Sequence, residues 1–400
     1  MRTWCEVDTA ALAENVRTFR RLVGDSTILA PAVKSNGYGH GLLLAARAFL
    51  SGGADWLCVD ALDEARALRS AGVTAPVYIM GYVPLDELAE AAALDVRLVV
   101  YNRETIDVLA KQAQALVRPQ RLHLKIETGN HRQGVGAGEA VALAARIAAS
   151  PGLVLEGVGS HFANIEDTTD HSYARQQLAA FEAAVGALRA AGHTVPIRHL
   201  SNTAAALLWP DQRFEMVRIG IGAYGLWPSK EARVAALLAG RNELALRPAL
   251  TWKTRVAQIK DIPEGAFVGY GCTYMATHPT RLAILPVGYA DGYDRALSNM
   301  AHVLIRGRRA PVRGRVCMNI TMVDVTDIPG ASLEDEAVLL GTSEGPAAET
   351  ISADRLGDWA GTIHYEIVAR LADHLPRVEV ASSGTGVQPA ADRAYRPPKF

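Results

Sequence analysis

The chain has 400 residues, of which 49% are hydrophobic and 21% are charged, and its formal net charge is −1. This length is too great for one ordinary hydrophobic core and predicts two domains. The balanced charge gives no electrostatic reason to expect a nucleic acid or an anionic membrane surface as a partner.

Two further features of the sequence bear on where in the cell the protein is found. The first ten residues, MRTWCEVDTA, contain no apolar segment of the kind found in secretory signals, and no stretch of the chain is apolar for long enough to span a bilayer. The cysteines, Cys5, Cys58, Cys272 and Cys317, show no C-x-x-C spacing, which disfavours a zinc or redox site. We therefore expect a cytoplasmic protein with no metal site and no membrane contact.

Strand-like and helix-like segments alternate from about residue 26 to residue 220. The strands are short β-branched apolar runs, and the segments between them are rich in Ala and Leu at helical spacing. The predicted strands are Ile28–Lys34, Trp56–Val59, Val77–Met80, Arg97–Tyr101, Leu122–Glu127, Leu155–His161, Ile197–Ser201 and Met216–Ile219. The predicted helices include Gly41–Ser51, Asp63–Ser70, Leu85–Ala92, Glu104–Leu116 and Tyr173–Ala191. Eight strand–helix repeats predict an α/β fold whose first domain, residues 1–240, is a parallel (β/α)8 barrel.

The pattern changes after about residue 240. Gly and Pro separate short β-like segments, and little helix is expected before about residue 348. These segments are Leu250–Ile259, Ala283–Val287, His302–Ile305, Ala310–Val312, Met322–Val325 and Ala337–Leu340. We therefore expect a mainly β second domain over residues 241–380. Residues 381–400 are polar and rich in Pro and Gly, and they predict a mobile tail.

Polar residues stand at the ends of several predicted barrel strands, where the chemistry of such barrels takes place. They are Lys34, Lys125, Glu127, His161, Ser201–Asn202–Thr203, Arg218 and the loop Gly220–Ile221–Gly222. Lys34 ends an apolar strand and is partly desolvated, which frees its amine to react with a carbonyl group. A lone lysine more often extends its charge into solvent, but here glycines, Tyr38 and His40 crowd around it.

The loops after the last two strands are candidates for phosphate binding. Thr203 offers a hydroxyl group there, and the backbone N–H groups of Gly220–Gly222 can form an anion-binding nest. Without the barrel, an ordinary tight turn would explain the two glycines as well.

The segment AVKSNGYGHG resembles the lysine motif of bacterial alanine racemases, which are fold-type-III enzymes that use pyridoxal 5'-phosphate (PLP). The resemblance continues in the family's order through LKIETGNHRQG, GVGSHFANIED, HLSNTAA, VRIGIGAYGLWPS, VGYGCTY, LPVGYADGYDR, GRVCMNITMVDV and IHYEIVARL. It covers roughly Val7 to Arg377, and the complete set of motifs is far more specific than the first alone.

The resemblance implies a role for each matching residue. Lys34 carries PLP, Arg218 faces the pyridine nitrogen, and His161 hydrogen-bonds that arginine and the catalytic tyrosine. The expected phosphate and cofactor contacts come from Tyr38, Asn202, Thr203, Gly220, Ile221 and Tyr365. Arg132 lies near the cofactor and the substrate carboxylate. Lys125 matches a lysine that is carbamylated in many members, although it could be an unmodified partner of Glu127.

Three further residues match groups that act across a subunit interface in the family. Tyr270 matches the second catalytic base, and Tyr289 and Met318 match substrate contacts at the other subunit's barrel mouth. The resemblance thus implies a homodimer with shared active sites. Read without it, Tyr270, Tyr289 and Tyr365 could each be ordinary core tyrosines.

We therefore expect PLP-dependent racemisation of L- and D-alanine by two bases, Lys34 and the partner's Tyr270, supplying D-alanine for peptidoglycan. Arg218 disfavours a fold-type-III decarboxylase, because such enzymes place a carboxylate at the pyridine nitrogen and an arginine can only donate to it. The β-rich domain disfavours a PLP carrier protein, which would be a barrel alone. Asn319 stands where the family usually has Asp, which leaves open a broader-specificity or serine racemase.

Overall fold

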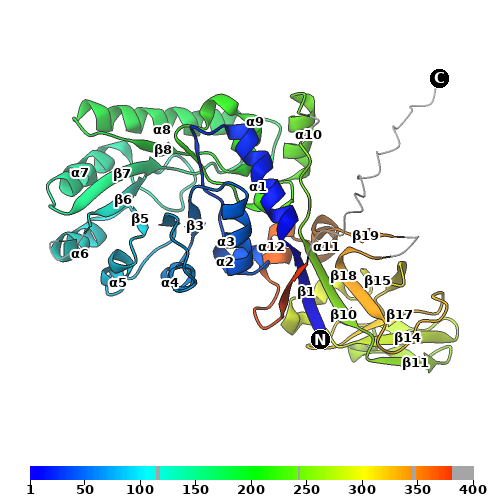
Figure 1. The fold of residues 1–400 in the computed structure, drawn as a ribbon. Helices are drawn as coiled ribbons and strands as arrows, with labels where there is room; N and C mark the ends of the chain where they lie inside the picture. The colour runs from blue at the N-terminus through cyan, green and yellow to red at the C-terminus, as the bar shows by residue number, and fades with distance from the viewer. Residues whose placement is uncertain (114–117, 242–243, 345–347, 381–400) are drawn as a thin grey trace, which may run out of the picture.

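Eight short parallel strands form the barrel that the sequence predicts (Figure 1). The computed structural model describes residues 1–113, 118–241, 244–344 and 348–380. The barrel strands are β2 (Ile28–Leu29), β3 (Leu57–Val59), β4 (Val77–Ile79), β5 (Arg97–Val100), β6 (Gln120–Lys125), β7 (Leu153–Gly159), β8 (Ile197–His199) and β9 (Met216–Val217). Each lies within or overlaps a predicted strand, so the predicted fold class is confirmed.

Backbone contacts join these strands into a closed ring. Strands β3 to β8 pair in sequence order as one parallel sheet, and β2 pairs with β9. A parallel bridge between Ala32 and Cys58 links β2 to β3. At the other junction, the Arg218 backbone N–H donates to the Ser201 carbonyl at 3.0 Å. The carboxyl ends of all eight strands therefore meet at one mouth.

Several barrel helices bury an apolar stripe against the rest of the barrel. In α7 (Ala137–Ala148), for example, Ala140, Leu143, Ala144 and Ile147 are buried at the spacing of one helix face. The other helices are α1 (Thr9–Val23), α3 (Leu42–Ser51), α4 (Leu62–Ser70), α5 (Leu88–Ala93), α6 (Arg103–Ala113), α8 (Ser172–Ala190), α9 (Thr203–Leu208) and α10 (Lys230–Leu238). The last residues of the predicted helix Glu104–Leu116 lie outside the described residues, as does the predicted tail 381–400.

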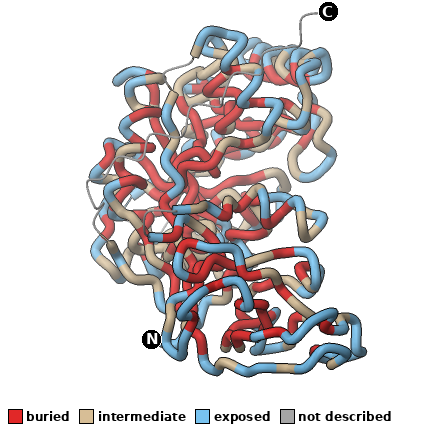
Figure 2. The backbone as a smooth tube through the Cα atoms, turned by 90° about the vertical axis from the view of Figure 1, so that its right-hand side faces the viewer, coloured by how far each residue is buried: buried red, intermediate tan, exposed pale blue. Residues whose placement is uncertain are grey.

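The second domain is mainly β, as expected. Its main sheet has the order β16-β15-β18-β10-β1-β20, with β19 on β18, and a smaller sheet has the order β11-β14-β17. The elements are β10 (Leu250–Arg255), β11 (Gln258–Ile262), β12 (Phe267–Val268), β13 (Tyr274–Met275), β14 (Thr280–Leu285), β15 (His302–Ile305), β16 (Arg308–Pro311), β17 (Thr321–Asp324), β18 (Glu336–Thr342), β19 (Thr350–Ile351), α11 (Ala353–Ala360), α12 (His364–Ala369) and β20 (Arg377–Val380). Figure 2 shows buried backbone running through the interior of both domains, with exposed loops around it.

The first strand of the chain lies within the range 1–240 that is expected for the first domain, but it pairs outside the barrel. Strand β1 (Thr3–Asp8) lies between β10, antiparallel, and β20, parallel, in the main sheet of the second domain. Asp8 then caps α1 by accepting from the Ala11 backbone N–H at 2.8 Å. The barrel therefore starts with α1, and the chain's first residues hold the two domains together.

A left-handed turn places Lys34. The segment α2 (Lys34–Tyr38) is no regular α-helix, since Ser35, Asn36 and Gly37 have φ of 53°, 52° and 62°. Such a conformation costs about 1–2 kcal/mol for each non-glycine residue. Side chains compensate: the Asn36 Oδ1 accepts from the Leu42 N–H at 2.9 Å, and the Ser35 N–H donates to Glu64 at 2.6 Å.

Gly39 ends this turn at φ 80°, where a Cβ atom would lie 1.9 Å from the Val368 carbonyl oxygen in α12. We expect Gly39→Ala to lower the free energy of unfolding by about 3 kcal/mol or more, because it combines an overlap with backbone strain. Gly24→Ala is the control, since Gly24 has φ 77° but open space around it, and it should cost only about 1 kcal/mol. Denaturant unfolding measures both. Equal losses would show that the contact with α12 has no effect on stability.

Candidate active site

A cavity of about 620 Å³ opens at the carboxyl ends of the barrel strands. Most of the residues expected to bind or act on the cofactor line it, and they come from the loops after β2, β6, β7, β8 and β9 and from α12 of the second domain. They are Lys34, Tyr38, Lys125, Arg132, His161, Asn202, Thr203, Arg218, Gly220 and Tyr365. Ile221 is fully buried next to Gly220. The cavity is within the size range of small-molecule sites.

Positive side chains dominate the cavity wall. Lys34, Arg132 and Arg218 are among the residues that line it. Of the described lining residues, only Asp60 and Glu166 carry a carboxylate group. The Lys34 ammonium lies 3.5 Å from an Asp60 carboxylate oxygen, a contact that the sequence did not suggest. This excess of positive charge suits a ligand that carries phosphate or carboxylate groups.

Arg218 is only 8% exposed, and the barrel satisfies most of its donors. One terminal nitrogen donates to the Ser160 carbonyl at 2.7 Å. The other donates to the His199 carbonyl at 3.0 Å and to the His199 ring Nδ1. The hydrogen bond from His161 that the resemblance implies is not among those of the described residues. The sequence did not point to His199, because the predicted strand Ile197–Ser201 places it in the interior of the strand, whereas β8 ends at His199.

The loops after β8 and β9 form a narrow cradle. The Gly220 N–H donates to the Thr203 hydroxyl at 3.0 Å, and the Tyr38 ring stacks on Tyr224 with centroids 4.8 Å apart. A Cβ atom on Gly220 would lie 3.0 Å from the Tyr38 hydroxyl oxygen, so a side chain there would occupy the cradle. Hydroxyl groups and backbone N–H groups in such a cradle fit a phosphate group.

Glu166 is a second residue that the sequence did not single out. The Tyr365 hydroxyl donates to its carboxylate at 3.3 Å, and the Asn202 amide donates at 3.4 Å. Burial, followed by the nearby charge of Asp167, raises the pKa of Glu166 to about 7, although the bond from Tyr365 opposes the rise. Its charge therefore changes near neutral pH beside the cradle.

Lys125 lines the cavity together with Arg132 and Arg218. Burial holds the pKa of Lys125 well below its usual range, and the charges of Arg218 and Arg132 lower it further against the opposing effect of Glu127. This lowered pKa favours the neutral, nucleophilic form of the amine.

The remaining expected site residues lie elsewhere in the chain. Tyr270, Tyr289 and Met318, with Asn319, line a separate hollow of about 480 Å³ in the second domain. Tyr270 is 74% exposed and Met318 is 56% exposed, so both side chains are open to solvent in a single chain. Within one chain, these residues do not line the Lys34 cavity.

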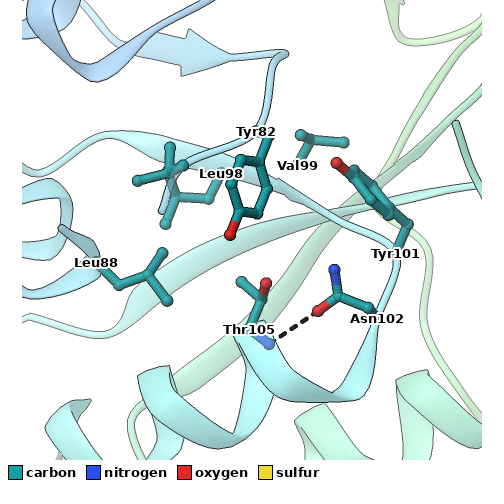
Figure 3. A pocket seen from close by; sticks show the side chains of 8 residues that line it. Tyr82, Leu88, Leu98, Val99, Tyr101, Asn102 and Thr105 are labelled. Carbon is teal, nitrogen blue, oxygen red and sulfur yellow. Dashed lines mark hydrogen bonds between the residues drawn. The ribbon is translucent and has the colours of Figure 1, made fainter. Parts of the chain in front are cut away.

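A third and much smaller cavity lies beside the barrel mouth (Figure 3). It is lined by Tyr82, Leu88, Leu98, Tyr101 and neighbouring residues, and at its edge the Thr105 N–H donates to Asn102 at 2.8 Å. Its volume of about 10 Å³ is at most enough for one water molecule. It is too small for a substrate or a cofactor.

Comparison with known proteins identifies the family. The family model for the alanine racemase N-terminal domain matches residues 7–228, and that for the alanine racemase C-terminal domain matches residues 249–379. The chain belongs to the alanine racemase family. It is 40% identical to the alanine racemase of Desulfovibrio desulfuricans over 377 residues, which cover 94% of this chain and 98% of that protein. It is also 40% identical to the alanine racemase of Symbiobacterium thermophilum over 375 residues, covering 94% and 96%.

Solved structures of alanine racemases share the whole fold. The Bacillus anthracis alanine racemase with bound L-Ala-P superposes with a TM-score of 0.88 at 33% identity, covering 96% of each chain. The enzyme from D-cycloserine-producing Streptomyces lavendulae gives 0.87 at 34%, covering 95% of this chain and 97% of that one. The chain is thus an enzyme of the amino-acid racemase class. None of the helices in the described part of the chain combines the length and apolar character needed to cross a bilayer.

The position of Glu166 predicts how stability varies with pH. Its folded-state pKa of about 7 lies above the ordinary value of 4.5, so the folded state binds this proton more tightly than the unfolded state does. The resulting stabilisation is complete below the ordinary value and is lost as the pH rises through about 7. In cofactor-free protein, Glu166→Gln should therefore gain stability relative to wild type between pH 5 and pH 8.

Denaturant unfolding at several pH values measures this difference. Glu139→Gln, at an exposed position in α7, is the control and should leave the shape of the stability curve unchanged. Parallel curves for wild type and Glu166→Gln would mean that Glu166 does not titrate in this range.

Proposed function

We propose that the protein interconverts L- and D-alanine with PLP held by Lys34. The observation that carries this proposal is the position of the Lys34 amine in one cavity with Arg218 and the cradle of Thr203 and Gly220. The residues fit the cofactor: a lysine for its aldehyde, hydroxyl and backbone N–H donors for its phosphate, and a permanent donor for its ring nitrogen. Membership of the alanine racemase family supports the same assignment.

Inversion of an α-carbon requires one proton to leave from one face and another to arrive at the opposite face. PLP supplies the electron sink that makes the α-proton acidic. In our proposal, the Lys34 Nζ takes or returns the proton on one face, and the Tyr270 hydroxyl does so on the other. Tyr38, Thr203, Gly220, Ile221 and Tyr365 would hold the phosphate.

Three cationic or polar residues would complete the site. Arg218 can donate a hydrogen bond but cannot give up its proton, so it would bind the ring nitrogen without protonating it. Arg132 would bind the substrate carboxylate, and His161 would lie close to the catalytic tyrosine. Each lines the cavity, which supports these roles.

The second base would come from a second copy of the chain. Tyr270, Tyr289 and Met318 lie together in an exposed hollow away from the Lys34 cavity, so one chain alone supplies half of each reaction site. A homodimer in which each hollow covers the partner's cavity would bring both halves together. This arrangement would also exclude water from the reacting atoms.

Asn319 keeps an alternative open, a racemase of broader specificity or one for serine, because this exposed residue lies in the hollow with Tyr270. A racemisation screen over a panel of amino acids with added PLP distinguishes the two. Turnover mainly of alanine would support the proposal. We propose that this activity supplies D-alanine for peptidoglycan in the cytoplasm. Faster turnover of serine or larger amino acids would favour the alternative.

Lys34 should be the attachment site of PLP. Borohydride treatment of the protein with PLP should leave a stable cofactor adduct on the Lys34 peptide, and Lys34→Ala should lose both the adduct and racemisation in either direction. Lys111→Ala, at an exposed lysine, is the control and should keep both. Peptide mapping by mass spectrometry gives the answer, and an adduct on another lysine would refute the assignment.

Shared sites predict complementation between inactive variants. Lys34→Ala and Tyr270→Phe should each lose racemisation, but after subunit exchange the heterodimer has one site with both bases. An equal mixture should then regain about a quarter of the wild-type activity, because half the dimers are mixed and each has one working site. A mixture of Lys34→Ala with Lys34→Ala/Tyr270→Phe is the control and should stay inactive. No recovery in exchanged mixtures would contradict the shared-site proposal.

Lys125 should be carbamylated. Its neutral amine can add to carbon dioxide with loss of one proton, and the resulting carboxylate would form charge-assisted hydrogen bonds with Arg132. Intact mass of rapidly handled protein should show the added carboxyl group, which Lys125→Ala should lack. An unmodified ammonium group in well-resolved electron density would disprove the modification.

A further inference from the structure

A line of hydrogen bonds runs from Arg218 into the barrel interior. An Arg218 terminal nitrogen contacts the His199 Nδ1, and the His199 Nε2 lies 2.8 Å from the His123 Nδ1. The His123 Nε2 in turn lies 3.1 Å from a carboxylate oxygen of Glu156. We refer to Arg218, His199, His123 and Glu156 as the barrel relay.

Only one placement of protons satisfies every bond of the barrel relay. A guanidinium group can only donate, so the His199 Nδ1 must accept and the His199 Nε2 must carry the hydrogen. That hydrogen requires an acceptor at the His123 Nδ1, which places the hydrogen of His123 on Nε2. The last acceptor is the Glu156 carboxylate, and all the bonds therefore point away from Arg218.

The electrostatics agree with this placement. Burial lowers the pKa of both His199 and His123, so both rings are neutral at ordinary pH. For Glu156, burial alone would raise the pKa, but the hydrogen bond from His123 and the charge of Arg97 bring it below its usual value. Arg97 and Arg121 contact its oxygens at 3.2 and 3.5 Å, so it stays ionised and accepts.

Strand β7 has glycines at the two positions where the imidazole rings pack against it. A Cβ atom on Gly157 would lie 2.4 Å from the His123 Nδ1, and one on Gly159 would lie 2.1 Å from the His199 Cε1. On the other side, the Tyr78 ring packs on His123 at 4.7 Å and on His199 at 5.5 Å. The glycines leave space for the two imidazole rings, and the Tyr78 ring packs against both of them.

We propose that His199, His123 and Glu156 are positioning residues that hold Arg218 as a directed donor toward the cavity. The bonds to His199 use both hydrogens of one terminal nitrogen, and the Ser160 carbonyl takes one hydrogen of the other. The donors that remain are the second hydrogen of that nitrogen and the Nε hydrogen. The effect on catalysis rests on the proposed role of Arg218, whereas the proton pattern of the relay does not.

The proton pattern can be measured in cofactor-free protein. Nitrogen NMR of 15N-histidine protein should show His123 and His199 as neutral Nε2–H tautomers from about pH 6 to 9, assigned by the signals missing from His123→Phe. A protonated ring, or an Nδ1–H tautomer at either residue, would overturn the relay. If His123→Phe does not fold, the signals missing from His199→Asn supply the assignment instead. The wild-type spectrum then still shows the tautomer of each ring.

The positioning role is tested by a double-mutant cycle in the PLP-loaded enzyme. His123→Phe should lower kcat about 10-fold with little change in the KM for alanine, by analogy with the loss of outer-shell partners elsewhere. Its effect should vanish when Arg218→Lys is already present, because the relay acts through that guanidinium. An undiminished effect in the Arg218→Lys background, or full kcat in His123→Phe, would refute the positioning role.

Two further variants separate this role from general packing. His123→Asn keeps an acceptor for the His199 Nε2–H and should recover part of the lost kcat. Trp56→Phe, which loosens the packing 5.7 Å from His123 without removing a relay bond, should lower stability but leave kcat unchanged. If wild-type protein neither holds PLP nor racemises alanine, the proposed function fails, while the NMR result still decides the relay.

Discussion

The burial of one guanidinium group determines much of the barrel interior. Arg218 carries a permanent charge at a position that is 8% exposed, and an unsatisfied buried charge is strongly destabilising. Two neighbouring strands therefore provide three acceptors: the Ser160 carbonyl directly after β7, and the carbonyl and ring of His199 in β8. The His199 ring then needs a hydrogen-bond acceptor of its own, which His123 provides. The glycines of β7 leave the space that both rings occupy.

A similar constraint operates at the lysine. Lys34 begins a left-handed turn, and that turn is held from outside the barrel. The Asn36 amide donates to Asp373 at 2.8 Å, and the Arg377 guanidinium donates to the Gly39 carbonyl at 3.0 Å. Both partners belong to the second domain, whose α12 also supplies Tyr365 to the cavity. The second domain therefore stabilises the first half of the site as well as carrying the Tyr270 hollow.

The two halves of the proposed site differ in their lining. The Lys34 cavity is lined by several cationic groups that suit a phosphate and a carboxylate, while the Tyr270 hollow combines aromatic and apolar side chains with Arg295 and Arg315. Exposed apolar groups around a hollow are typical of a surface that another protein covers. A second copy placed there would bring a base to the open face of the cavity and remove its water. Asn319 would face the substrate in that arrangement.

The sequence alone determined the barrel, the mainly β second domain and the residues at the strand ends, because strand–helix alternation and strand-end position are local properties of the chain. The family motifs added the matching tyrosines and Met318. Only the tertiary structure decided the rest. Strand β1 joins the far sheet through pairing with residues more than 200 positions away. His199, His123, Glu156 and Glu166 look like ordinary residues within their segments. Their partners and burial, which control their protonation, exist only after the strands have closed into a ring.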